Sequence, residues 1–385
     1  MNVKSEKYIR MVEDVLDPER VKESIRRQTA AWNFKPVDYP PLIVECPPPD
    51  WWPNFLYKEA FYDKEKMLIF QLAPVYQHCG LRDDFVPCVR TDYGVVVVPS
   101  AFGSEISVPE NIHVFEKTYT IGPWVKNVIL DKDPPSVKNL RIPDVRRDGL
   151  MKNVLEAEEY FVEKLEGTGI RTCLMFLLAP LTNAFSLRGN KLVKDFFRKP
   201  EFVDDLLTLL SDVYIEFNKI QKETVKEPLT YGVQKGVGEG IWMAEGGVRY
   251  ADDIVVLLSP KLYNRFCKPI NERSLKPFNG GLYHTCGDVK PLLEDIISTK
   301  GVRAINLGNP EMYSLKEVAD LCYGKACIIW NGGPRQGQSI HDWIEEVDEC
   351  LGDRRTGIIF SVIEGVGSFE EANKLVQTWK GHFLK

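Results

Sequence analysis

The C-terminal third of the chain alternates between short apolar runs and segments whose apolar residues recur at helical spacing. The apolar runs lie near residues 281–285, 303–307, 326–330 and 357–362, with a helical segment after each of them. Their centres advance by roughly 20 to 30 residues, which is the pace of consecutive strand–helix units. Repeated units of this kind predict parallel strands, because each helix carries the chain back to the edge where the previous strand began.

Further strands are predicted upstream, around Ile43, around Val95, over residues 172–178 and within residues 230–243. The four consecutive valines that begin at Val95 favour a strand buried on both faces. Seven or eight strand–helix units predict a closed (β/α)8 barrel of the TIM type in an α/β protein. A doubly wound open sheet is the alternative.

The sequence also predicts a simple domain organisation. Residues 1–39 carry apolar side chains at helical spacing and are expected to form an N-terminal helical extension. Residues 40–385 would form the barrel, which is the catalytic domain. An irregular segment around residues 100–150 is rich in proline and glycine, which favours an inserted cap over core structure.

Composition places the chain among soluble globular proteins, with 44% hydrophobic and 27% charged residues. A formal net charge of -6 argues against nucleic acid as a partner, since no basic footprint is present. No apolar run approaches the ~20 residues that a membrane span needs. The 9 cysteines are an odd, scattered set, which indicates a reducing compartment. We therefore expect a cytoplasmic protein without membrane contact.

The most distinctive local pattern is His284-Thr-Cys286, at the end of an apolar run. The two-residue period of a strand would point both side chains to the same side. An imidazole nitrogen and a thiolate are ligands that zinc prefers, so the pair predicts two corners of a metal site. The alternative is ordinary packing, in which the cysteine is a small buried hydrophobe and the histidine is merely hydrogen-bonded.

In a barrel, the active site lies at the C-terminal ends of the strands, and polar residues gather there in this chain. Glu364 follows the last predicted strand and is the predicted third metal ligand, with helix capping or a salt bridge as the alternative. Cys327 competes with it but begins a strand, so it should lie at the other end. The candidate catalytic groups, which would orient substrate or ligands, are Glu239, Asp288, Asn306 and Asn331. The candidate substrate-binding groups are Trp51, Trp52, Asp92 and Tyr283.

Trp51 and Trp52 stand in a proline-rich stretch, which predicts a stiff loop. Their indoles could stack on a flat aromatic ligand. The alternative is that they pack and hold the loop against the barrel rim.

Several segments together resemble the uroporphyrinogen decarboxylase superfamily. They are Leu258-Ser-Pro-Lys-Leu-Tyr, Pro269, Leu282-Tyr-His-Thr-Cys-Gly-Asp, Ile305-Asn, Glu364-Gly-Val-Gly and Glu370-Glu-Ala-Asn. Within that superfamily, His-x-Cys-Gly is similar to the motif of corrinoid-linked methyltransferases, whose His and Cys bind zinc. The resemblance thus implies one zinc ion per chain and a corrinoid carried by a separate partner protein.

Two departures from the family pattern refine this expectation. The decarboxylases have an arginine-rich motif after the first strand, where this chain has Pro47-Pro-Pro-Asp-Trp-Trp, so porphyrinogen decarboxylation is not expected. The methylcobamide:thiol methyltransferases have a cysteine where Glu364 aligns. A site with a carboxylate is harder than one with two thiolates and matches an oxygen-bearing substrate better.

The resemblance therefore implies a zinc-dependent methyltransferase that moves a methyl group from an O-methylated small molecule, such as an aromatic methyl ether, or from an N-methylated one, to a Co(I) corrinoid protein. The alternatives are transfer from a methylcorrinoid to a thiol or to tetrahydrofolate, a cofactor-free decarboxylase, and a metal-free binding protein. A homodimer is compatible with each of these.

Overall fold

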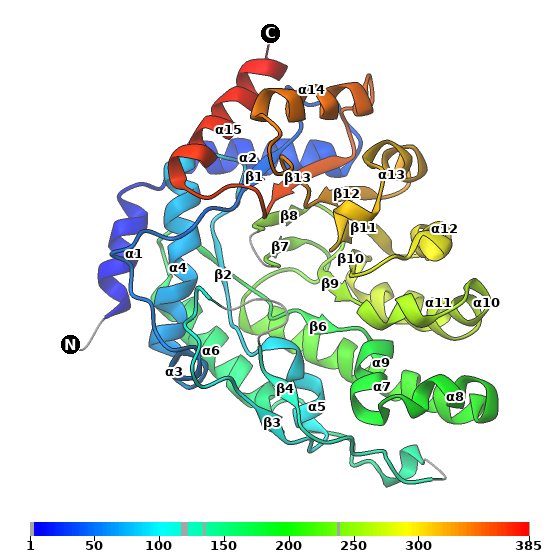
Figure 1. Cartoon of the computed structure of the whole chain (residues 1–385). Helices are drawn as coiled ribbons and strands as arrows, with labels where there is room; N and C mark the ends of the chain where they lie inside the picture. The colour runs from blue at the N-terminus through cyan, green and yellow to red at the C-terminus, as the bar shows by residue number, and fades with distance from the viewer. Residues whose placement is uncertain (1–3, 117–121, 134–135, 237–238, 385) are drawn as a thin grey trace.

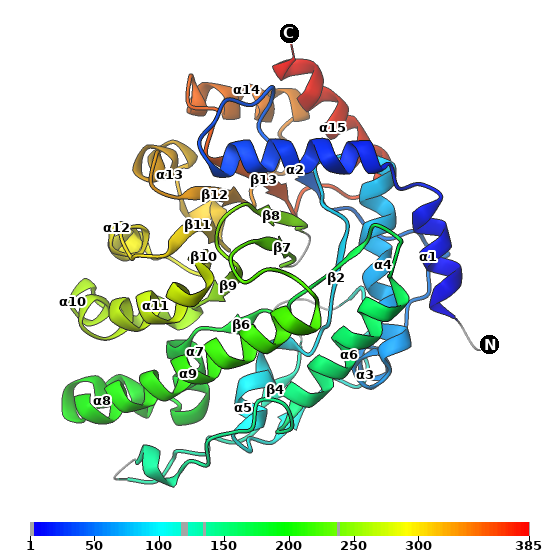
Figure 2. The same ribbon diagram turned by 180° about the vertical axis from the view of Figure 1, so that it is seen from behind.

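The computed structural model describes residues 4–116, 122–133, 136–236 and 239–384. Parallel strands form a ring at the centre, and helices surround it (Figures 1 and 2). Seven strands form one parallel sheet in the order β1-β13-β12-β11-β10-β9-β6, and β2 pairs in parallel with β5. The strands of these two sheets are β1 (Leu42–Val44), β2 (Cys88–Arg90), β5 (Arg171–Cys173), β6 (Leu177–Leu178), β9 (Val248–Ala251), β10 (Gly281–Thr285), β11 (Val302–Leu307), β12 (Cys327–Trp330) and β13 (Ile358–Val362).

Two links join these sheets into a barrel. β5 and β6 are successive parts of one extended segment, of which β5 pairs with β2 and β6 pairs with β9. On the other side, the backbone N–H of Asp84 donates to the carbonyl of Leu42 at 2.8 Å, which ties the entry of β2 to β1. The predicted (β/α)8 barrel is therefore confirmed, with β5 and β6 sharing one strand position.

The helices lie outside the ring of strands (Figures 1 and 2). Several helices that follow a barrel strand begin at a serine whose side chain accepts a backbone N–H, such as Ser314 and Ser368. The helices are α1 (Ser5–Glu13), α2 (Pro18–Trp32), α3 (Tyr57–Tyr62), α4 (Lys64–Leu81), α5 (Val97–Ala101), α6 (Leu150–Lys164), α7 (Pro180–Arg188), α8 (Lys191–Arg198), α9 (Pro200–Thr224), α10 (Pro260–Leu262), α11 (Lys268–Leu275), α12 (Leu293–Ile297), α13 (Leu315–Cys322), α14 (Ile340–Leu351) and α15 (Phe369–Phe383).

The strand predicted around Val95 is wrong. β2 ends at Arg90, Gly94 turns the chain with a φ of 64°, and the valines enter a short helical segment that continues as α5. Val97 and Val98 are buried there as fully as they would be in a strand. A short apolar run does not distinguish a buried strand from a buried helix, so burial overrides the β preference of valine.

The strand predicted within residues 230–243 is instead an antiparallel hairpin of β7 (Gly232–Gln234) and β8 (Ile241–Met243). The barrel strand that follows is β9. In the view of Figure 1 the hairpin lies within the ring of strands, and the Gly240 carbonyl accepts the N–H of Val86 at 3.1 Å. Lys235 and Glu239, near the tip of the hairpin, are almost fully buried. The hairpin therefore adds charged side chains to a space that barrels usually fill with apolar ones.

Among its described residues, the segment between α5 and α6 contains a small antiparallel pair, β3 (Ile106–Ser107) with β4 (Trp124–Val125), and a short 3-10 helix, η2 (Val137–Asn139). The N-terminal helices α1 and α2 pack against the barrel. Arg27 of α2 forms a buried ion pair with Asp84 and a partly exposed one with Asp38, beside the starts of β1 and β2. No helix in the described part of the chain is long and apolar enough to cross a bilayer.

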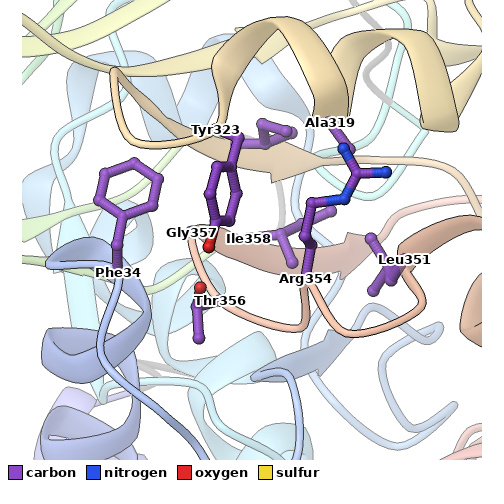
Figure 3. Close-up of a pocket in the computed structure, with 9 residues that line it drawn as sticks. Phe34, Ala319, Tyr323, Leu351, Arg354, Thr356, Gly357 and Ile358 are labelled. Atoms are coloured by element: carbon purple, nitrogen blue, oxygen red, sulfur yellow. The ribbon is translucent and has the colours of Figure 1, made fainter.

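Figure 3 shows a small pocket lined by Phe34, Tyr323, Arg354 and Thr356, among others. Its volume of about 10 Å³ suits a water molecule at most. Gly357, which also lines it, directly precedes β13, so the pocket lies at the N-terminal end of this strand. His284 and Cys286 lie at the C-terminal end of β10, and thus at the opposite end of the barrel.

Candidate metal centre

The centre of the candidate site is the end of β10. This strand is buried along its whole length between β9 and β11, so its register is well determined. His284 is 7% exposed, and its Nε2 lies 3.6 Å from the Sγ of Cys286, which is half-buried just past the strand. The two side chains therefore present a nitrogen and a sulfur to the same space.

Asp253 supplies a third potential ligand. Asp253 is the second residue after the end of β9, and β9 is the neighbour of β10 in the sheet. Its Oδ1 lies 3.9 Å from His284 Nε2 and accepts the backbone N–H of Cys286 at 2.9 Å. One ligand atom each from Asp253, His284 and Cys286 lie within 4.8 Å of one another. Strand pairing thus brings a carboxylate, an imidazole and a thiol together at the C-terminal ends of two adjacent strands.

Asn306 determines which histidine nitrogen is available. Its Oδ1 lies 2.6 Å from His284 Nδ1, while its Nδ2 donates to the carbonyl of Ile329 at 2.9 Å and to Oδ1 of Asn331 at 3.0 Å. These two acceptors fix the amide orientation, so the amide oxygen faces the histidine. His284 must then carry its proton on Nδ1, which leaves the lone pair of Nε2 toward Cys286 and Asp253.

The ionisation of the group follows from its burial. Burial, aided by the nearby Arg249 guanidinium, lowers the pKa of His284 to about 4, so the ring is neutral at pH 7. Burial, and then the Asp253 carboxylate, raise the pKa of the Cys286 thiol to about 12. The histidine is therefore ready to bind a metal, whereas the thiol needs a cation beside it before it ionises.

The dimensions and chemistry fit a zinc ion. Bonds of ~2.0 to 2.3 Å in a tetrahedron place ligand atoms about 3.3 to 3.8 Å apart. The 3.6 Å and 3.9 Å separations from His284 Nε2 lie at or near this range. Gly308 keeps the space open, because a Cβ there would lie 2.7 Å from Cys286 Sγ. A nitrogen, a sulfur and a carboxylate oxygen form a donor set that a borderline-soft ion accepts.

Glu364, the third ligand predicted from the sequence, is exposed in the loop after β13 and is not a member of this group. In the sheet, β11 and β12 separate β13 from β10. The position next to His284 and Cys286 is taken by Asp253. A role for Glu364 as a ligand stays a prediction.

The predicted orienting residues divide into two kinds. Asn306 and Asn331 are buried and connected through the hydrogen bond between their amides. Glu239 is also buried, with its Oε1 3.6 Å from Nη1 of Arg249. Asp288, in contrast, is exposed and accepts the N–H of Lys290 in its own loop.

The predicted substrate-binding residues have structural contacts of their own. Trp52 is 3% exposed, packs on Tyr8 of α1 and donates from Nε1 to the carbonyl of Ile69 in α4 at 2.9 Å. The ring of Trp51 packs against the ring of Trp52, and Trp51 is 53% exposed. This arrangement favours the packing interpretation of the pair.

Tyr283 and Asp92 lie on β10 and after β2. Tyr283 precedes His284 on a strand, so it points to the other side, where its hydroxyl donates to Asp252 at 3.2 Å. Asp92 is buried after β2, and its Oδ1 accepts the N–H of Gly94 in the turn that leads to the valine-rich segment. A role for Tyr283 or Asp92 in substrate binding stays a prediction.

Sequence reasoning missed Asp253 and Arg249. Arg249 lies in the middle of β9, and its Nη2 donates to Oδ1 of Asn306 at 3.0 Å. A signal existed in Val248-Arg-Tyr-Ala-Asp-Asp, where two carboxylates end a short apolar run. The hairpin of β7 and β8, which directly precedes this segment, obscures the signal because its apolar residues predict a strand of their own.

Comparisons with known proteins agree with this architecture. Residues 57–225 match the family model for uroporphyrinogen decarboxylase, a range that ends before the His284 motif. A methyltransferase from Methanosarcina mazei has the same fold, with a TM-score of 0.65 and 18% identity over 94% of this chain and 99% of that chain. No curated protein sequence matches the chain significantly. The family match covers less than half of the chain, and the structural likeness shows a shared fold.

Proposed function

We propose that the protein is a zinc-dependent methyltransferase that moves a methyl group from an O-methylated or N-methylated small molecule to a Co(I) corrinoid held by a separate protein. One observation carries this proposal, namely the group of Asp253, His284 and Cys286 with its histidine oriented by Asn306. The fold shared with a methyltransferase supports it.

Each residue of the group has a definable task. His284 offers Nε2, Cys286 offers Sγ and Asp253 offers a carboxylate oxygen, while Asn306 holds the imidazole in the tautomer that this requires. A zinc ion bound by these atoms would supply Lewis acidity to the oxygen or nitrogen from which the methyl group departs. The half-buried positions of Asp253 and Cys286 leave that side of the group accessible to a substrate.

The ligand chemistry favours an oxygen-bearing donor. One thiolate, one imidazole and one carboxylate form a harder set than the two-thiolate sites of thiol-methylating enzymes, and harder sets suit oxygen ligands. In the transfer, the carbon–oxygen bond breaks with its electron pair left on the oxygen, and Co(I) supplies the pair for the new bond to carbon. The small molecule is thus demethylated, and no further oxidant or reductant is required.

A spectroscopic assay tests the proposal. The purified protein is mixed with a Co(I) corrinoid protein or free Co(I) cobalamin and with an aromatic methyl ether, and the cobalt spectrum is followed. We expect conversion of the Co(I) spectrum into that of methyl-Co(III) with wild-type protein. We expect no conversion with Cys286→Ala. Cys350→Ala is the matched control, because Cys350 is also half-buried but lies in α14 on the outside of the barrel.

Two outcomes would contradict the proposal. The first is equal conversion by wild type and Cys286→Ala, which would remove the metal group from the reaction. The second is a protein that is inert with every methyl ether and methylamine but demethylates methyl-Co(III) cobalamin when a thiol or tetrahydrofolate is added. That second result would assign the opposite direction of transfer.

A further inference from the structure

A second set of charged side chains lies inside the barrel, separate from the potential metal ligands. Arg90 ends β2, Lys235 follows β7 and Arg249 lies in β9. They are 7%, 4% and 5% exposed, respectively. Three cations this deeply buried are unusual, because lysine and arginine are seldom buried unless a partner compensates for the lost hydration.

Among the described residues, these cations are poorly compensated. The Nζ of Lys235, the Nε of Arg90, and the Nε and Nη1 of Arg249 are buried without a hydrogen-bond partner there. The bonds from Arg90 to the carbonyls of Thr91 and Gly236 are long, at 3.3 and 3.4 Å. A buried charged donor without an acceptor is costly, so a ligand that supplies the acceptors would be bound favourably.

Glu239 and Glu45 do not balance the charge of these three cations. Glu239 is 3.6 Å from Arg249 Nη1, beyond hydrogen-bond distance, and its Oε2 has no partner among the described residues. Glu45 follows β1, and burial together with the Glu239 carboxylate raises its pKa to about 7, so it is only partly ionised at neutral pH. The three cations therefore outnumber Glu239 and Glu45. Burial lowers the pKa of Lys235, and an anion beside the ammonium would raise it again.

The surroundings of the three cations indicate which kind of anion would fit. The Phe176 ring has the guanidinium carbon of Arg90 4.8 Å from its centroid and that of Arg249 5.7 Å from it. A guanidinium donates in a planar fork that matches a carboxylate, whereas an ammonium acts as a point charge. A small excess of positive charge, presented by two such forks, suits a planar monoanion.

This set lies next to the candidate metal centre. Arg249 Nη2 donates to Asn306 Oδ1 at 3.0 Å, and the same oxygen faces His284 Nδ1 at 2.6 Å. Two successive hydrogen bonds therefore connect Arg249 to His284, the potential metal ligand. One small molecule could therefore contact both places at once.

We propose that Arg90, Lys235 and Arg249 bind the carboxylate of the substrate, so that the methyl donor is a methylated carboxylic acid whose anionic end lies in the barrel interior. That the bound acid is a methyl donor rests on the proposed function. The anion site itself does not depend on methyl transfer. The carboxylate would anchor the molecule while its methylated end reaches the space before His284.

Calorimetric titration of the purified protein, without corrinoid, tests the inference. The probes are 4-methoxybenzoate and the neutral 4-methoxybenzamide, which has nearly the same shape. We expect the carboxylate to bind at least tenfold more tightly than the amide. We expect Lys235→Met and Arg90→Met each to weaken carboxylate binding at least tenfold and to leave amide binding unchanged. Arg249 is kept intact because it contacts Asn306.

The control is the double variant Lys222→Met with Glu227→Gln. It removes a buried cation whose charge is already paired, at 3.0 Å, so carboxylate binding should equal that of wild type. Thermal unfolding gives a second readout, in which 4-methoxybenzoate should raise the midpoint for wild type and not for Lys235→Met. If one of the variants fails to fold, the affinities of wild-type protein for the carboxylate and the amide still test the inference.

Equal affinities for carboxylate and amide would overturn the inference, as would unchanged carboxylate binding in Lys235→Met. Inorganic phosphate and methanesulfonate serve as further probes, and tighter binding of either would overturn the assignment to a carboxylate. The titration tests the anion site, whereas the cobalt assay tests the proposed function, so the two hypotheses can be refuted independently. Carboxylate binding without methyl transfer would refute the proposed function alone, and methyl transfer without preference for carboxylates would refute this inference alone.

Discussion

Asn306 accepts the Nδ1–H of His284 at 2.6 Å, and this single hydrogen bond decides which face of the imidazole can serve as a ligand. Asn306 can do so because its own amide N–H groups are engaged by Ile329 and Asn331. The two residues stand side by side on β10 and β11, where register pairs His284 with Asn306. Strand pairing therefore holds His284 in the tautomer whose Nε2 can bind a metal.

Replacing Asn306 should weaken metal binding without removing a ligand. We expect Asn306→Ala to lower zinc affinity by about 10- to 100-fold, because the histidine loses the acceptor that fixes its tautomer. Asn306→Asp keeps an acceptor oxygen and should restore most of the affinity. Competition with a chromophoric chelator measures both. Equal affinity in wild type and Asn306→Ala would refute the role given to this hydrogen bond.

Two carboxylates, those of Asp253 and Glu364, are candidates for the third metal ligand. Asp253→Ala should lose most of the bound zinc, because its Oδ1 lies 3.9 Å from His284 Nε2. Glu364→Ala should keep full occupancy, because Glu364 is exposed after β13. Elemental analysis of both purified variants provides the comparison. The reverse pattern would restore Glu364 as the ligand and exclude Asp253.

Glu45 should make stability depend on pH. Its pKa is raised from 4.5 to about 7, so between these values the folded state holds a proton that the unfolded state has lost. Stability must therefore fall as pH rises through this window. Urea unfolding at several pH values should show a shallower decline for Glu45→Gln than for wild type. Parallel curves for the two proteins would contradict the raised pKa.

The two adjacent tryptophans should differ in their effect on stability. Trp52→Ala empties a buried site between α1 and α4 and should cost about 3 to 5 kcal/mol of unfolding free energy. Trp51→Ala removes a half-exposed ring and should cost less than about 1 kcal/mol. Denaturant titration measures both values. A Trp51→Ala variant with normal stability but weakened binding of aromatic methyl ethers would instead favour the stacking interpretation.

The sequence was sufficient to predict the barrel and the pair His284 and Cys286. Both depend on short-range patterns, namely the alternation of strands with helices and the two-residue period of a strand. The valines after Val95 were misassigned because an apolar run has no period that separates a strand from a helix. Their burial in and around α5 became visible only with the tertiary structure.

The remaining site residues depend on contacts between distant segments. Asp253 is 31 positions from His284 in the chain, and they meet only because β9 pairs with β10. The hairpin of β7 and β8 obscured that strand by taking its expected place. The same hairpin puts Lys235 and Glu239 inside the barrel, a placement that depends on tertiary contacts and not on local pattern.

The central claim is that Asp253, His284 and Cys286 hold a metal ion, and zinc content per chain tests it most directly. Protein purified without chelator and then saturated with zinc and desalted should contain about one zinc per chain. Cys286→Ala and His284→Ala should contain far less, with Cys350→Ala equal to wild type. Wild-type protein that retains no zinc, or a His284→Ala variant that retains as much as wild type, would contradict the account.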